Sequence, residues 1–179
     1  MFRACLTALA CLALVACDQQ SEVMQQIEKQ QAERQQMAAD SAQKSKAFLE
    51  TNGARAGVTT TASGLQYEVV RAVHADVARP TASDRVTVMY EGKLVDGKIF
   101  DSSYARKEPI AFLLGEVIPG WTEGLQLMKP GEEYTFYIPS DIGYGARGAG
   151  SDIPPNAALV FRVELLKFQR PDGTTVSAR

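Results

Sequence analysis

Four segments in the C-terminal two-thirds of the chain alternate apolar and polar residues with a period of two. They are Leu65–Arg71, Arg85–Tyr90, Tyr134–Ile138 and Leu159–Leu165. A short segment in which apolar and polar residues alternate is typical of a β-strand with one buried face. The Gly, Pro and Asp residues between the segments favour turns. The pattern therefore predicts an antiparallel sheet that is covered on one side.

A single helical segment interrupts the predicted strands. It begins at Pro119 and runs to about Met128, where Lys129-Pro130-Gly131 stops it. Trp121, Leu125 and Met128 stand at i, i+4 and i+7, so one face of this helix can pack on the sheet. The expected fold class is α+β, a curved antiparallel β-sheet wrapped on one short helix and preceded by a polar N-terminal helix. We place this domain at residues 65–170, followed by a polar tail at 171–179.

The first residues have the pattern of an export signal. One arginine, Arg3, precedes an apolar run from Ala4 to Ala16, which is too short to span a bilayer as a helix. The run ends in Leu14-Val15-Ala16-Cys17, which resembles the bacterial lipobox. We therefore predict a signal peptide over residues 1–16 and lipidation at Cys17. The alternative is an ordinary signal peptide that happens to contain cysteines.

The cysteine positions set the expected compartment and anchor. All three cysteines fall at positions 5, 11 and 17, so a protein cleaved before Cys17 would hold neither a free thiol nor a disulfide. Acyl chains on Cys17, at about 0.8 kcal/mol per buried methylene, would hold it on a membrane. We expect a location in the cell envelope, with the domain facing the periplasm or the surface. Asp18 signals inner-membrane retention in some Gram-negative bacteria, but the rule varies, and the choice between inner and outer membrane stays open.

Residues 17–50 form a polar segment without Pro or Gly, rich in good helix formers. Its apolar positions are sparse and follow no sustained heptad. A solvated helical arm is expected, either a spacer from the membrane or a homodimerisation arm through residues 18–50. Thr51-Asn52-Gly53 should end this helix, and residues 51–64 should link it to the domain.

Several classes of chemistry are disfavoured by composition. The formal charge is -2 and no basic run is present, so nucleic acid is not an expected partner. His74 is the only histidine and lies outside any catalytic-looking cluster. We expect no metal, no cofactor and no Ser/His/Asp or Cys/His nucleophile.

Six blocks in order carry a resemblance to a known family. They are Val88-Met89-Tyr90-Glu91-Gly92, Phe100-Asp101-Ser102-Ser103, Val117-Ile118-Pro119-Gly120-Trp121, Ile138–Gly145, Ile153-Pro154-Pro155-Asn156 and Leu159–Leu165. Over nearly all of 65–168 the chain resembles the FKBP-type peptidyl-prolyl cis/trans isomerases. The segment before the domain is loosely similar to the macrophage infectivity potentiator-type branch.

The resemblance implies an apolar pocket between the helix and the sheet, with Trp121 as its floor. It assigns the walls to Tyr90, Phe100, Val117, Ile118 and Phe161, and the mouth to Asp101, Tyr144 and Ile153, with Arg106 pairing with Asp101 or Tyr90. Phe112, Phe136 and Leu165 are interpreted as core residues. Ile110 stands where the family often has an aromatic residue.

The implied activity is prolyl isomerisation of proline-containing polypeptides during the folding of exported proteins, without a cofactor. Macrolide inhibitors of the family are expected to bind. Two alternatives remain: a non-catalytic module that grips prolyl segments, and a lipid-anchored scaffold in which the fold has no active site.

Overall fold

The computed structural model describes residues 7–74 and 76–178, and for residues 7–19 and 21 it describes the backbone only. The chain divides into two compact units, Met1–Met37 and Ala38–Arg179. The predicted signal peptide and the lipidation of Cys17 fall on residues or side chains outside the described ones. Within the described part, no helix is long and apolar enough to cross a membrane.

Helix α1 (Thr7–Gly53) is 47 residues long and contains the whole predicted arm. In the first unit, α1 leaves the side chains of Val23, Met24, Ile27 and Met37 between 41% and 55% exposed. In the second unit, Ser45 and Asn52 are buried. The end of the helix at Gly53 agrees with the helix-stopping residues seen in the sequence.

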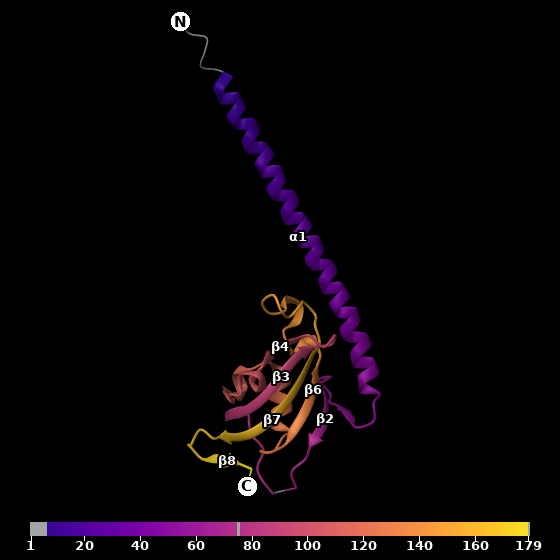
Figure 1. The fold of residues 1–179 in the computed structure, drawn as a ribbon, viewed down its shortest axis with the longest axis vertical. Helices are drawn as coiled ribbons and strands as arrows, with labels where there is room; N and C mark the ends of the chain where they lie inside the picture. The colour runs from indigo at the N-terminus through magenta and orange to yellow at the C-terminus, as the bar shows by residue number, and fades with distance from the viewer. Residues whose placement is uncertain (1–6, 75, 179) are drawn as a thin grey trace. The chain divides into compact units, whose positions relative to one another are not determined.

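The second unit is built on an eight-stranded antiparallel sheet (Figure 1). Its strands are β1 (Val58–Thr60), β2 (Gln66–Arg71), β3 (Arg85–Leu94), β4 (Ile99–Ser102), β5 (Ile110–Leu113), β6 (Glu133–Ile138), β7 (Leu159–Gln169) and β8 (Thr175–Ser177). The spatial order is β1-β2-β6-β7-β3-β4, with β5 paired to β3 and β8 to β7. The predicted α+β fold is confirmed.

Short helices connect the strands. They are α2 (Ser103–Arg106), α3 (Pro119–Gln126) and the 3-10 turns η1 (Leu114–Glu116), η2 (Ser140–Ile142) and η3 (Gly145–Arg147). Helix α3 packs its buried residues against the core. Proline at the first position of α3 suits a helix start, because its missing N–H would have no partner there. Helix α3 ends at Gln126, slightly before the predicted end near Met128. Trp121, Leu125 and Met128 are all at most 4% exposed, so the three positions predicted to form an apolar face are buried.

Alternation along β3 and β7 separates the core from the outer face. On β3, Val86, Val88 and Tyr90 are buried, and on β7, Val163 and Leu165 are fully buried. The residues between them point to the other side of the sheet. The core therefore lies on the α3 side, and the outer side carries charged residues such as Glu91 and Arg162.

Two segments that the sequence suggested to be irregular carry short strands. The 171–179 tail contains β8, which pairs Thr175, Val176 and Ser177 with β7. The 51–64 linker contains β1, which pairs with β2. Each has only three residues, too few to show a period of two, so their pairing depends on the neighbouring strand.

Candidate active site

One cavity of about 380 Å3 opens between α3 and the sheet. Its walls contain every predicted site residue together with two further ones. The lining residues are Tyr90, Phe100, Asp101, Phe112, Glu116, Val117, Ile118, Trp121, Tyr144, Ile153 and Phe161. The chain thus brings together residues that are up to 71 positions apart in sequence, and their role in catalysis stays a prediction.

Backbone geometry places these side chains on one side of the sheet. Tyr90 on β3 and Phe161 on β7 both face α3, and Gly92 is paired with Phe161 across the two strands. A Cβ atom on Gly92 would lie 2.5 Å from the Phe161 ring and 2.7 Å from the Phe100 ring. Only glycine fits there, because the two rings occupy the space that a side chain would need. Gly92 therefore allows the aromatic walls to meet.

Trp121 lies at the centre of an aromatic cluster. Its ring is 5.2 Å from Tyr90, 5.2 Å from Phe161 and 5.7 Å from Phe112, with interplanar angles of 83° to 87°. Such edge-to-face contacts are the favoured geometry of aromatic pairs. Trp121 is 4% exposed, and its Nε1 has no hydrogen-bond partner among the described residues. The floor of the cavity is therefore a closely packed set of aromatic rings.

Three polar side chains form a network at the rim. The Tyr90 hydroxyl donates a hydrogen bond to Asp101 Oδ2, and Arg106 Nη1 donates to Asp101 Oδ1 at 2.5 Å. Arg106 Nη2 also lies 3.5 Å from the Tyr90 hydroxyl. Both partners that the sequence suggested for Arg106 are thus in contact with it. Arg106 and Asp101 are partly exposed, so this ion pair lies at the solvent boundary.

The rim network decides the protonation state of Asp101. Burial alone would raise the pKa of this carboxyl, but hydrogen bonds from Arg106 and Tyr90 outweigh it and hold the pKa below its usual value. Burial and the bond to Asp101 raise the pKa of Tyr90 to about 12. Near neutral pH the site therefore presents a carboxylate held by a neutral phenol and a guanidinium.

Tyr144 and Ile153 reach the cavity from the loop between η2 and β7. The Tyr144 side chain is 39% exposed, whereas Ile153 is 7% exposed. Burial, followed by the charge of Asp101, raises the pKa of the Tyr144 hydroxyl. This hydroxyl remains a hydrogen-bond donor at the mouth of the cavity at neutral pH.

Two lining residues were not predicted as part of the site. Phe112 was interpreted as core, but it is only half-buried, and its ring forms part of the cavity wall beside Trp121. Glu116 lies in η1, just before Val117. Glu116 could have been expected near the cavity only because it directly precedes the predicted site residues Val117 and Ile118. Phe112 alternates with Ala111, which predicts that its side chain faces inward. Alternation does not show whether an inward-facing side chain packs in the core or lines a cavity. Ile110 is half-buried against the core and does not line the cavity.

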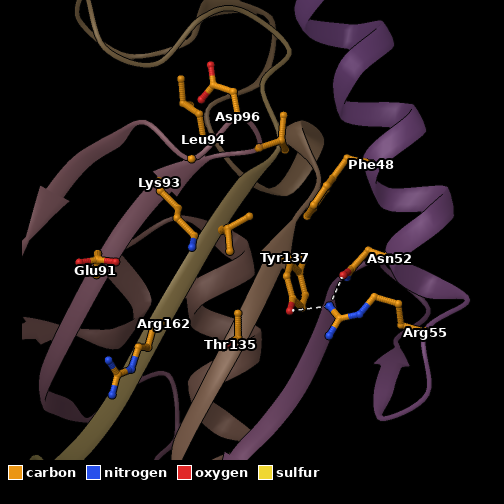
Figure 2. A pocket seen from close by; sticks show the side chains of 13 residues that line it. Phe48, Asn52, Arg55, Glu91, Lys93, Leu94, Asp96, Thr135, Tyr137 and Arg162 are labelled. Atoms are coloured by element: carbon orange, nitrogen blue, oxygen red, sulfur yellow. Dashed lines mark hydrogen bonds between the residues drawn. The ribbon is translucent and has the colours of Figure 1, made fainter.

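A second cavity, of about 470 Å3, lies on the outer face of the sheet (Figure 2). Phe48 and Asn52 of α1 form one side, and Lys93, Thr135, Tyr137 and Arg162 of the strands form the other. Arg55 donates to Asn52 Oδ1 at 2.8 Å and to the Tyr137 hydroxyl at 3.1 Å. Its guanidinium also pairs with Glu68 at 3.1 Å. Charged side chains such as Lys93 and Arg162 line this outer cavity beside apolar ones such as Leu94 and Val160, and the polar share of its lining is larger than in the aromatic cavity.

The described residues contain no group of three or more His, Cys, Asp or Glu side chains that could hold a metal ion. His74 is exposed. The lining residues make the aromatic cavity a largely apolar enclosure with a few hydrogen-bonding groups at its rim.

Comparisons with known proteins agree with this geometry. Residues 77–166 match the family model described as FKBP-type peptidyl-prolyl cis-trans isomerase. Residues 5–69 match the model described as the domain amino terminal to FKBP-type peptidyl-prolyl isomerase. The second match places the arm and the domain in an order known from that family.

Individual relatives are similar over most of this chain. A protein of Neisseria meningitidis serogroup B named probable FKBP-type peptidyl-prolyl cis-trans isomerase FkpA is 53% identical over 73% of this chain and 47% of its own length. The peptidyl-prolyl cis-trans isomerase Mip of Coxiella burnetii is 47% identical over 72% of this chain and 55% of its own length. The crystal structure of FkpA from Escherichia coli superposes with a TM-score of 0.76 at 42% identity, covering 84% of this chain and 71% of that one. The chain thus spans about half the length of these two curated relatives.

Proposed function

Since the chain belongs to the FKBP-type peptidyl-prolyl cis/trans isomerase family, we propose that it catalyses rotation about X-Pro bonds in polypeptides. The observation that carries the proposal is the aromatic cavity itself. Its floor is Trp121, and all nine residues expected at the site line it. Partners are proline-containing polypeptides, and macrolide inhibitors of the family are expected to compete for the same cavity.

An apolar cavity suits this reaction because of how the barrier arises. Resonance in the planar peptide bond places partial charge on oxygen and nitrogen, and its loss on twisting creates a barrier of about 18–20 kcal/mol. Uncatalysed X-Pro bonds therefore isomerise in tens to hundreds of seconds. The twisted transition state is less dipolar than the planar form, so moving the bond from water into the aromatic enclosure favours the transition state.

Rim groups then hold the polypeptide in register. The Ile118 backbone N–H precedes α3, where helix N–H groups have no partner within the helix, and it donates to a substrate carbonyl. The Tyr144 hydroxyl donates to a second carbonyl from the mouth. The Asp101 carboxylate lies beside the rotating bond, where Tyr90 and Arg106 fix its orientation. No group needs to exchange a proton with the substrate.

A protease-coupled assay on a short prolyl peptide tests the proposal. The chain is expected to accelerate the slow phase, and a macrolide of the class that binds this family is expected to suppress the acceleration. Asp101→Ala and Tyr144→Phe should keep the fold, checked by circular dichroism, and lower the rate. Unchanged rates in both variants would show that another part of the molecule carries any activity.

Location in the cell envelope, through a lipid on Cys17, is the second part of the proposal. It is supported by Leu14-Val15-Ala16-Cys17 and by a similar protein of Legionella longbeachae that is named outer membrane protein MIP. In that setting the isomerase assists the folding of exported proteins. Mass spectrometry of the membrane-bound protein should find a diacylglyceryl thioether on Cys17. Cys17→Ala should release the protein from membranes, and retention of this variant on membranes would contradict the anchor.

Dimerisation through residues 18–50 is the last part. It is supported by the partly exposed Val23, Met24 and Ile27 on α1, which offer apolar surface that a second arm could cover. Sedimentation of the delipidated protein, with and without residues 18–50, distinguishes a dimerisation arm from a spacer. A monomer in both samples would leave the spacer role.

A further inference from the structure

Ser45 joins the end of α1 to the loop that carries the cavity mouth. Its side chain is 6% exposed, although the arm around it is mostly solvated. Ser45 Oγ donates to the Asn156 carbonyl at 3.1 Å and accepts from the Ala158 N–H at 2.7 Å. These partners are more than 110 residues away in sequence. The hydroxyl is therefore satisfied on both sides by backbone groups of one short segment.

Asn156 in turn closes the loop that begins after Tyr144. Its backbone is left-handed, with φ of 59°, and its N–H donates to the Gly145 carbonyl at 2.9 Å. Inside the loop, Ala149 and Ile153 exchange backbone hydrogen bonds of 2.9 Å and 3.1 Å. Tyr144 thus directly precedes Gly145, which Asn156 holds, and Ile153 is bonded within the same loop that Asn156 closes.

A side-chain bond reinforces the same link. Asn156 Nδ2 donates to the Ala38 carbonyl of α1 at 3.4 Å. Asparagine tolerates the left-handed conformation of Asn156 better than most residues do, and contacts from α1 add to the bonds that hold this residue in place. Helix α1 supplies two of these contacts, through Ser45 and through Ala38.

We propose that Ser45 is a positioning residue of the isomerase site: through Asn156 it fixes the loop that presents Tyr144 and Ile153 to the substrate. The proposal rests on the proposed isomerase function and extends it to the arm, which then contributes to the site as well as to anchoring. Without the hydroxyl, the buried Ala158 N–H loses its acceptor and the segment 156–158 must shift to find another. The loop between Gly145 and Asn156 shifts with it.

A second polar anchor on α1 provides a matched control. Asn52 Nδ2 donates to Gln66 Oε1 at 2.8 Å, and Gln66 Nε2 donates to the Leu49 carbonyl at 2.9 Å. Both side chains are at most 7% exposed. Gln66 lies on β2 and pairs with Tyr137 on β6, so this anchor holds the same helix without touching the mouth loop. Gln66→Ala therefore weakens the attachment of α1 to the sheet without changing the mouth loop, and its effect on activity shows what weaker attachment alone does.

The test measures prolyl isomerisation and thermal unfolding of the full chain and its variants, with all rates taken well below each midpoint. Ser45→Ala is expected to lower kcat/KM about three- to tenfold, the range for one lost neutral hydrogen bond. The change should appear mainly as a higher KM, because the mouth holds the substrate in both ground and transition states. Ser45→Thr, which restores the hydroxyl, should recover the rate to within about twofold. Gln66→Ala should lower the unfolding midpoint and leave kcat/KM unchanged.

A double-mutant cycle identifies the route of the effect. If Ser45 acts through Tyr144, Ser45→Ala should cost much less in the Tyr144→Phe background than in the parent chain. Additive effects, an unchanged KM in Ser45→Ala, or an equal loss in Gln66→Ala would each overturn the proposal. If Ser45→Ala does not fold, Ser45→Cys replaces it, because cysteine keeps the side-chain volume and forms a weaker hydrogen bond. The same loss of kcat/KM and the same double-mutant result are then expected of Ser45→Cys. An inactive parent chain would overturn the proposed function and this inference together.

Discussion

The two cavities share strands β3 and β7 and differ in their other elements and in the character of their lining. On β3, Tyr90 lines the aromatic cavity, and a side chain at Gly92 would meet its Phe161 and Phe100 rings. The alternate residues Glu91 and Lys93 line the outer cavity. On β7, Phe161 belongs to the first cavity and Arg162 to the second. The outer cavity is the larger of the two, at about 470 Å3 against 380 Å3. Volume therefore does not identify the site.

Polarity does identify it, for a physical reason. Prolyl rotation gains from an environment that solvates the planar dipolar bond poorly, which the Trp121 cluster provides. In the outer cavity, Arg55, Lys93 and Arg162 would stabilise the partial charge on the planar carbonyl and raise the barrier relative to the aromatic cavity. One sheet thus carries an apolar enclosure and a charged cleft back to back. Mutations at adjacent positions of one strand can separate their contributions.

The largest effect is expected from Gly92→Ala. The new methyl group would meet the Phe161 and Phe100 rings at less than 3 Å, so both rings must move into the cavity. We expect kcat/KM to fall by about 100-fold or more, equivalent to ~2.7 kcal/mol of transition-state stabilisation. Unfolding free energy should fall by about 1–3 kcal/mol, which is typical of overpacking. Peptide isomerisation and urea unfolding measure the two quantities.

Lys93→Ala is the matched control for that variant, one position along β3 on the opposite face. Its side chain lines the outer cavity, so the rate should stay within about twofold of the parent, less than ~0.4 kcal/mol. A similar loss of rate in both variants would mean that the sheet as a whole, rather than the aromatic face, controls activity.

The site residues were predicted from the resemblance to the family, and side-chain alternation supports only the face on which some of them lie. Tyr90 and Phe161 face inward because of the strand period, and the helix position of Trp121 follows from Pro119 and the spacing to Leu125. Phe112 packs against the core as interpreted and also lines the cavity, which alternation could not indicate, because it gives the face of a residue and not whether a cavity lies beside it. The bond from Ser45 to Asn156 joins distant segments, and no local pattern reports such a contact. Strand β8 could not be predicted either, because its three residues form a strand only by pairing with β7.

Asp101→Ala is expected to have the next largest effect on the aromatic face. It removes the carboxylate that Tyr90 and Arg106 hold at the rim, and leaves both donors without this acceptor. A decrease in kcat/KM of about tenfold, or ~1.4 kcal/mol, is expected. Asp101→Asn keeps the shape without the charge, so a smaller loss in Asn than in Ala would assign part of the effect to packing.

The pH dependence of the parent chain gives an independent view of Asp101. Because the folded-state pKa is lowered, the carboxylate stays ionised below the unfolded-state value of about 3.9. Its contribution to stability is present above that value and is lost as pH falls through the folded-state pKa. The rate should therefore stay flat between about pH 8 and 5, since no rim group titrates there. A rate that halves near pH 6 would contradict this protonation state.

Tyr144→Phe should have a smaller effect, because the ring remains and only the hydroxyl is lost. Loss of one hydrogen bond to the substrate corresponds to a decrease of about three- to fivefold in kcat/KM. The side chain is 39% exposed, so stability should hardly change. Steady-state kinetics on one peptide measures the decrease. A loss as large as that of Gly92→Ala would show that the Tyr144 hydroxyl stabilises the twisted transition state and does more than hold the substrate.

The smallest effect on activity is expected on the outer face, from Arg162→Ala. Arg162 Nε donates to Glu133 Oε1 at 2.6 Å, and Glu133 is buried, but Arg71 also lies 3.6 Å from the same carboxylate. The remaining partner should limit the loss of stability to about 0.5–1 kcal/mol, as for other partly exposed ion pairs. Isomerisation should be unchanged, because the guanidinium faces away from Trp121 across the sheet. If urea unfolding is unaffected while the rate falls, charge on the outer face acts through β7 on Phe161, and the two cavities are coupled rather than independent.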